Sequence, residues 1–107
     1  MKKEKIIKEN QKFTEIINQN NSIKSKYYSI YYEKSETNKY GITIPKKIAK
    51  ANVRNKIKRR IKNIIIKNEK FIQKNFNYVI IVKKAILELN YRNMEEELIN
   101  LMKKERK

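Results

Sequence analysis

The sequence predicts an α+β fold, in which a small central sheet carries packed helices as an α/β sandwich. Apolar residues recur at helical spacing in three separate segments, and short runs of β-branched and aromatic residues lie between them. The chain has one Gly and one Pro among 107 residues, which leaves little room for flexible linkers. The predicted order is α-β-β-α-β-α within a single domain, residues 1–107.

The first half of the chain predicts one helix and two strands. Residues 3–18 read as a helix, with apolar positions at Ile6, Phe13, Ile16 and Ile17, and the polar run NQNNSIKSK ends it. The runs KYYSIYY at 26–32 and YGITIP at 40–45 have the composition of strands. Because the turn-like segment KSETNK joins them, we expect an antiparallel hairpin.

The second half predicts a helix, a buried strand and a last helix. From about Asn52 the apolar positions form one helical stripe, made of Val53, Ile57, Ile61, Ile64 and Ile65. The run NYVIIV at 77–82 is apolar on both faces, as is typical of a central strand. After the loop KKAILEL, Asn90 is placed to cap a last helix through Met94, Leu98, Leu101 and Met102, with Lys103 and Lys104 at its end.

The net charge of +17 indicates a polyanionic partner, because self-repulsion of this size disfavours a compact chain. Residues 37–68 hold eleven cations and no acid, and three of the five arginines (Arg54, Arg59 and Arg60) fall within seven residues there. Arg pairs with phosphate through a rigid fork of donors, whereas Lys offers a mobile point charge. The segment therefore predicts an RNA-binding helix. An ordinary solvated basic helix, in a chain biased toward Lys, Ile and Asn, is the alternative.

The composition excludes most enzyme mechanisms for this polypeptide alone. His, Cys and Asp are absent, so imidazole bases, thiol nucleophiles and His/Cys metal sites are excluded. Glu95, Glu96 and Glu97 are adjacent on a predicted helix and point in divergent directions, so they cannot form one site. We expect no catalytic residue and no bound metal. The lack of Cys and of any long apolar run predicts a cytoplasmic protein without membrane contact.

The stretch YGITIPKKIAKANVRNKIKRRIKNII resembles the signature region of the bacterial ribonuclease P protein component. In that family a strand ending in Ser/Pro-Lys-Lys leads to an Arg-Asn-Arg helix followed by Ile-Lys-Arg. Here those positions are Pro45-Lys46-Lys47, Arg54-Asn55-Lys56 and Ile57-Lys58-Arg59-Arg60. KENQKFTEII, YVIIVKKAILELNY and the Leu-rich last helix are similar as well, so the resemblance covers nearly the whole chain. The departures are Lys56 for a second Arg, Ile6-Ile7 for Arg-Leu, Ala49-Lys50 for a region with Gly, and Ala85 for Pro.

This resemblance implies the protein subunit of an RNA-based endonuclease that removes the 5′ leader of precursor tRNA. The implied fold is ribosomal protein S5 domain 2-like, with a left-handed strand–helix–strand crossover against the usual preference. The implied partners are the ribonuclease P RNA subunit and precursor tRNA. Catalysis with Mg²⁺ belongs to the RNA, the protein alone binds no cofactor, and the free protein is a monomer.

The resemblance also implies two sets of contact residues. The RNA-subunit set is Arg54, Asn55, Lys56, Lys58, Arg59, Arg60 and Lys62. The leader set, in a cleft between the first helix and the sheet, is Phe13, Ile17, Tyr28, Tyr31, Lys46 and Lys47. Side chains alternate along a strand, so Tyr28 and Tyr31 lie on opposite faces and only one face can line the cleft. Alignment with the family favours Tyr31.

The predicted contact residues and the predicted function each have an alternative interpretation. Phe13 and half of the tyrosines are core residues on the alternative interpretation, and Lys46 and Lys47 are ordinary surface lysines. The alternative function is a structural RNA-binding protein of the ribosomal-protein type, which shares the charge but needs no aromatic groove. A protein-only metallonuclease would need converging carboxylates, which the sequence does not offer.

Overall fold

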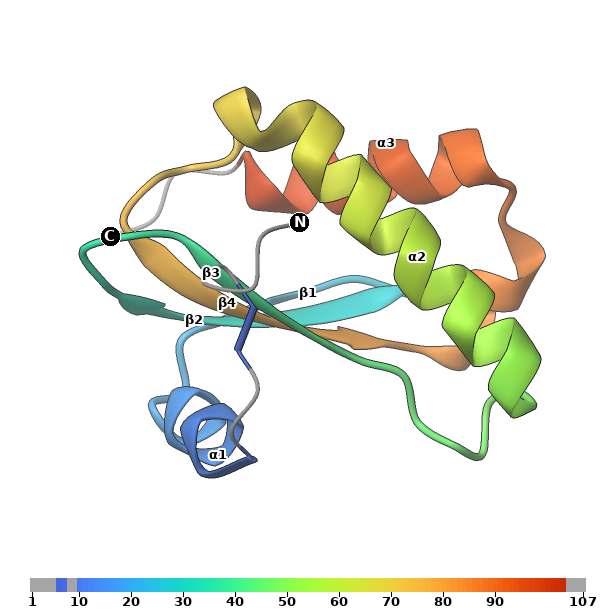
Figure 1. Ribbon diagram of the computed structural model, residues 1–107, viewed down its shortest axis with the longest axis horizontal. Coiled ribbons are helices and arrows are strands. Elements are labelled where there is room, and N and C mark those ends of the chain that lie inside the picture. The colour runs from blue at the N-terminus through green and yellow to red at the C-terminus, as the bar shows by residue number, and fades with distance from the viewer. Residues whose placement is uncertain (1–5, 8–9, 104–107) are drawn as a thin grey trace.

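The molecule has three layers: one helix, a four-stranded sheet and a pair of helices (Figure 1). The computed structural model describes residues 6–7 and 10–103, with side chains described from residue 12 onward in the second range. Helix α1 (Asn10–Asn18) lies on one face of the sheet, and α2 (Ala51–Asn68) and α3 (Tyr91–Met102) cover the other. The predicted α+β sandwich is confirmed.

The apolar strand β4 (Phe76–Val82) lies inside the sheet, as predicted. The strand order is β1-β2-β4-β3, with β1 at Ser22–Lys24, β2 at Tyr28–Lys34 and β3 at Lys39–Thr43. β4 pairs antiparallel with β2 and parallel with β3. Tyr78 and Ile80 pack on the α2/α3 side, whereas Val79 packs on the α1 side. A strand that is apolar on both faces is buried only where helices cover both faces of the sheet.

The predicted hairpin between residues 26–32 and 40–45 is wrong. β4 lies between β2 and β3, so these two strands are not neighbours. The physical reason is that the backbone of a buried strand needs a hydrogen-bonding strand on each side. β2 and β3 are the two strands that flank β4. The hairpin in the structure joins β1 to β2, with Ser22 opposite Tyr31 and Lys24 opposite Ser29.

The first helix is shorter than predicted. α1 begins at Asn10, whereas Ile6 forms a parallel bridge with Tyr40 and the N–H of Ile7 donates to the carbonyl of Tyr40 at 2.9 Å. Ile6 and Ile7 therefore extend along the edge of β3 rather than continuing the helix. Residues 3–5 and 8–9 of the predicted helix lie outside the described residues. The helix ends at the predicted polar run, where Asn20 adopts a φ of 62°, a conformation that Asn tolerates.

Helices α2 and α3 bury the predicted stripes. In α2 the buried residues are Ile57, Ile61, Ile64 and Ile65, whereas Val53, in the first turn of the helix, is exposed. In α3 the predicted Met94, Leu98, Leu101 and Met102 are buried. The predicted N-cap is confirmed, since the side chain of Asn90 accepts from the N–H of Asn93 at 2.8 Å. Lys104 lies outside the described residues, and the predicted loop before α3 is a short 3-10 helix at Lys84–Glu88.

A buried carboxylate fixes α1 to the sheet. Glu33 on β2 accepts hydrogen bonds from Lys12 at 2.8 Å, from Gln19 at 2.7 Å and from Asn77 of β4 at 2.8 Å. Burial alone would raise the pKa of Glu33, but the hydrogen bonds from Lys12, Asn77 and Gln19 together outweigh it and lower that pKa. The same contact raises the pKa of Lys12. Lys12 of α1, Gln19 just after the helix and two strands therefore meet at one acid.

We expect Glu33→Gln to lower the free energy of unfolding by about 1–3 kcal/mol at neutral pH, because it removes charge-assisted hydrogen bonds from a buried site. Since the pKa of Glu33 is lowered by folding, its contribution is present above the ordinary carboxyl pKa and is lost as the pH falls through the lowered value. Urea unfolding of both proteins from neutral pH into acid checks this. The difference in stability should shrink toward acid pH.

Glu15→Gln is the matched control. Glu15 lies 3.6 Å from the same Lys12 ammonium but is exposed, so its loss should change stability by about 1 kcal/mol or less. Equal losses in the two variants would contradict the structural role assigned to the buried carboxylate.

Candidate nucleic-acid interface

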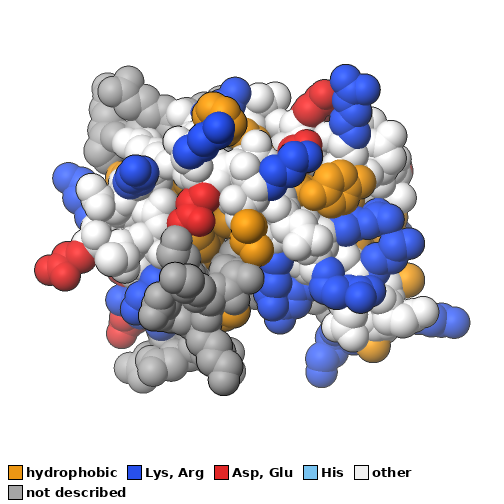
Figure 2. All heavy atoms as spheres, turned by 45° about the horizontal axis from the view of Figure 1, so that its top comes forward, with side chains coloured by type: hydrophobic (Ala, Val, Ile, Leu, Met, Phe, Trp, Pro, Cys, Tyr) orange, Lys and Arg blue, Asp and Glu red, His pale blue; other side chains and the backbone are white. Residues whose placement is uncertain are grey.

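The cations of α2 form an exposed face that points away from the sheet. Because the isoleucine stripe is buried and each residue turns the helix by about 100°, Asn55, Arg59 and Lys62 lie on the opposite side. Figure 2, with the α2/α3 side turned toward the viewer, shows Lys and Arg side chains gathered at the lower right without an acid visible among them. No acid within residues 12–103 forms an ion pair with Arg54, Arg59 or Arg60. No described acid therefore competes with an external anion for these three arginines.

Five polar side chains outline a hollow of about 550 Å³ on this face: Asn52, Asn55, Lys58, Arg59 and Lys62. Three of them bring positive charge, and the two amides can both donate and accept hydrogen bonds. The first turn of α2 holds no acid and its N-cap, Lys50, makes no side-chain capping bond, so the positive end of the helix dipole adds to the field. This surface is suited to phosphate oxygens and to base edges.

The seven residues predicted to contact an RNA subunit share one helix but differ in exposure. Asn55, Lys56, Lys58 and Arg59 are exposed, whereas Arg54, Arg60 and Lys62 are half-buried. The Nε of Arg54 is buried and has no hydrogen-bond partner in the described part of the chain. Replacement of Arg54 would therefore disturb packing as well as charge, and Arg59 is the cleaner probe of this face.

The other side of the sheet brings together Phe13, Ile17 and Tyr31, as predicted for one face of the strand at 26–32. All three are partly buried and pack against the cluster of Ile7, Ile16 and Val79. The ring of Phe13 lies directly over Gly41, where a Cβ atom would come within 2.6 Å of two ring carbons. Glycine at position 41 therefore lets the Phe13 ring of α1 lie close against β3, where a side chain would clash with it.

Tyr28 does not belong to this group, and its prediction as a leader contact is wrong. Its side chain is fully buried on the α2/α3 side, and its hydroxyl donates to the carbonyl of Met94 at 3.1 Å. Burial, and secondarily the charge of Glu97, raises the pKa of that hydroxyl well above its ordinary value. Because side chains alternate along β2, Tyr31 lies on the α1 side of the sheet and Tyr28 on the other.

Strand register aligns four side chains in a row across the α1 side of the sheet. Lys24 lies opposite Ser29, Ser29 opposite Ile81, and Ile81 opposite Thr43. Tyr31 is one step along β2 from Ser29 on the same face, and together these five residues are the α1-side strip. Ser29 is buried, Tyr31, Ile81 and Thr43 are half-buried, and Lys24 is exposed.

Lys46 and Lys47 are both exposed and follow β3 in the loop that leads to α2. This loop and α1 lie on the same side of the sheet (Figure 1). The two lysines therefore sit between the α1-side strip and the start of the basic helix. The position of Lys24 on this face could not be predicted from the sequence, since β1 is three residues long and Ile23 is its one apolar residue.

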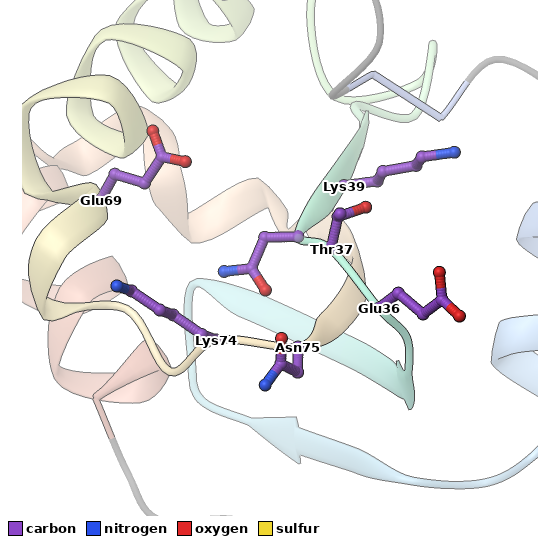
Figure 3. Close-up of a pocket in the computed structure, with 7 residues that line it drawn as sticks. Glu36, Thr37, Lys39, Glu69, Lys74 and Asn75 are labelled. Atoms are coloured by element: carbon purple, nitrogen blue, oxygen red, sulfur yellow. The ribbon is translucent and has the colours of Figure 1, made fainter.

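A further hollow, of about 660 Å³, lies at the end of the molecule opposite the start of α2 (Figures 1 and 3). Its charged lining residues are mixed, with Glu36 and Glu69 beside Lys39 and Lys74. The amide of Asn38 in this hollow is used internally, since it accepts from the N–H of Phe76 and donates to the carbonyl of Gln73. The hollow is thus part of the packing between the β2–β3 turn and the start of β4.

Among the described residues, no group of three or more carboxylates converges on one point. The two acids with lowered pKa values, Glu33 and Glu95, are held by amide and ammonium donors. No helix within the described ranges is long and apolar enough to cross a bilayer.

Comparisons with known proteins agree over the full length. The family model for ribonuclease P matches residues 1–106. The ribonuclease P protein component of Mycoplasma capricolum is 42% identical over 106 residues, covering 96% of this chain and 97% of the relative. That of Streptococcus agalactiae is 32% identical over 105 residues, covering 96% and 95%. The structure of the RNase P protein from Thermotoga maritima matches with a TM-score of 0.88 at 27% identity, covering 94% of this chain and 97% of that one. The chain belongs to the ribonuclease P protein component family.

Proposed function

We propose that this protein holds the catalytic RNA subunit on the outward face of α2 and the 5′ leader of precursor tRNA on the α1 side of its sheet. As a family member it takes part in tRNA processing, with the ribonuclease P RNA as its partner. The observation that carries the proposal is the outward-facing row of Asn55, Arg59 and Lys62, in which no described acid forms an ion pair with either cation. Cleavage with Mg²⁺ is assigned to the RNA, and the free protein is assigned as a cytoplasmic monomer.

The α2 face offers fixed positions for phosphates. Its buried side is locked by Ile57, Ile61, Ile64 and Ile65, so the cations opposite are held on a rigid element. Arg59 can pair with two phosphate oxygens at once, whereas Lys58 and Lys62 can adjust to neighbouring phosphates. Asn55 both donates and accepts, so it suits a base edge in a folded RNA.

The α1 side offers partly open rings for unpaired bases. The Tyr31 side chain is half-buried, and the Phe13 ring is held in place against Gly41. Stacking of a base on such a ring is worth about 1–3 kcal/mol. Lys46 and Lys47 are exposed and can bind phosphates of the leader next to the stacked bases. Glu33, an acid on this face, is buried and bound by Lys12, Gln19 and Asn77, so it repels an RNA strand little.

Reconstitution with the cognate RNA subunit tests the function as a whole. The protein should raise the rate at which leader-bearing precursor tRNA is cleaved at low Mg²⁺, and the complex should bind that precursor more tightly than leaderless tRNA. Equal affinity for the two substrates would contradict a leader-binding role. Co-purification with ribosomal subunits in place of ribonuclease P RNA would favour the structural alternative.

Arg59→Ala should weaken binding of the RNA subunit and flatten the plot of log affinity against log salt. The slope should change by about 0.7–0.9, the value expected for one lost phosphate contact. Lys74→Ala is the matched control, because it removes one positive charge at the opposite end of the molecule (Figure 3). Filter binding of each variant across a salt series gives both slopes. An unchanged slope for Arg59→Ala would place this arginine off the interface.

Tyr31→Ala should lower affinity for leader-bearing precursor by about 1–3 kcal/mol, the worth of one stacked base, and leave RNA-subunit binding unchanged. Tyr27→Ala serves as the control, since Tyr27 is a half-buried tyrosine of the same hairpin that packs on the α2/α3 cluster instead. Equilibrium binding of precursor and of leaderless tRNA to the reconstituted complex separates the two effects. Loss of RNA-subunit binding by Tyr31→Ala alone would mean that the α1 side meets the other RNA.

A further inference from the structure

We propose that Lys24, on the edge strand β1, binds a leader phosphate beside the base that stacks on Tyr31, so that the leader crosses all four strands from β3 to β1. This inference rests on the proposed leader-binding function of the α1 side. It assigns a binding residue to a strand that has no clear sequence signal, and it gives the bound leader a direction and a length requirement.

Strand register places Lys24 on the correct face. Lys24 pairs with Ser29, and the row continues through Ile81 to Thr43 at the other edge of the sheet. Side chains of paired residues point to the same face, so all four project toward the α1 side. With strands about 4.8 Å apart, the row spans about 14 Å, which a few extended nucleotides can cover.

Lys24 also reaches the ring that is proposed to stack a base. Its Nζ lies 5.6 Å from the centroid of the Tyr31 ring, near the outer limit of a cation–π contact. Such a contact is worth about 0.5–1 kcal/mol at an exposed site, less than a stacked base contributes. A base can therefore displace the ammonium from the ring, and the long, exposed side chain can follow the phosphate of the same nucleotide.

Among the described residues, no acid pairs with the ammonium of Lys24, whereas the ammonium of Lys26 pairs with Glu88. No acid in the described ranges lies in an ion pair with Lys24, but Lys26 lies 3.8 Å from Glu88. The strip thus has Lys24 at one edge, Lys46 and Lys47 near the other, and the partly apolar floor of Tyr31 and Ile81 between them. Cations that follow a backbone beside a stacking floor are the usual design of a single-strand binding surface.

The position of α2 sets the direction. Lys46 and Lys47 lie in the loop that joins β3 to α2, and α2 is proposed to hold the catalytic RNA. The β3 edge is then near the cleavage site and the β1 edge is remote from it. Lys24 should meet a nucleotide farther from the cleavage site than the nucleotides met by the two loop lysines, and only a leader long enough to reach β1 can use it.

The test compares Lys24→Ala with Lys26→Ala in the reconstituted complex. Lys26 is a matched control, an exposed lysine of the same hairpin whose Nζ lies 5.9 Å from the ring of Tyr27. Dissociation constants are measured for precursor tRNAs whose leaders grow one nucleotide at a time, and for leaderless tRNA. Lys24→Ala should weaken binding several-fold for long leaders alone and flatten their salt slope by about 0.7, as for one phosphate of a single strand. Lys26→Ala should match the wild type throughout.

Two results would overturn the inference. One is wild-type affinity of Lys24→Ala at every leader length, in a complex whose wild type still prefers leader-bearing substrate. The other is an equal loss on leaderless tRNA, which would place Lys24 against another part of the substrate. If the wild-type complex itself binds leader-bearing and leaderless tRNA equally, the result contradicts the proposed leader-binding function and not the role of Lys24 alone. Lys24→Arg should retain binding, which separates loss of charge from damage to the hairpin.

Discussion

The burial of β4 is the constraint on which the other features depend. Tyr78 and Ile80 need cover on one face, and Val79 needs cover on the other. Helices α2 and α3 supply the first cover and α1 supplies the second, which produces the three layers (Figure 1). Because α1 is only nine residues long, it covers part of its face, and the row from Lys24 to Thr43 keeps partly exposed side chains. A short helix over a mostly apolar strand therefore leaves open the surface on which we propose that a leader binds.

Two acids, Glu33 and Glu95, hold parts of the fold together. Glu33 binds α1 to two strands, and Glu95 joins the helices by accepting from Asn68 at 2.8 Å with Lys67 at 3.4 Å. Hydrogen bonds from Asn68 and then from Lys67 outweigh burial and lower the pKa of Glu95. Acids used in this way leave the outward face of α2 without a counter-charge among the described residues. A net charge of +17 is thus compatible with a packed core, because the repulsion is concentrated where a polyanion can relieve it.

The sequence predicted features whose signal is local. The period of Ile57, Ile61 and Ile64 identified both the buried and the basic side of α2, and the cap at Asn90 needed only its own neighbours. Features that depend on distant partners were predicted less well. Nothing near 26–32 or 40–45 indicates that β4 inserts between them, so the hairpin was assigned to the wrong pair of strands. Alternation showed that the tyrosines of β2 divide between two faces, but only the packing of α1 shows which face holds Tyr31.

The two proposed RNA surfaces meet at the loop between β3 and α2. The loop after β3 carries Lys46 and Lys47 and leads directly into α2, so one stretch of backbone borders both surfaces. The loop is anchored at one end by the pairing of β3 with β4 and at the other by the buried isoleucines of α2. An RNA strand on the sheet and a folded RNA on the helix would then be held in a fixed relation by rigid elements. The protein's contribution to cleavage, on this view, is alignment of substrate with ribozyme, and it requires no reactive group of its own.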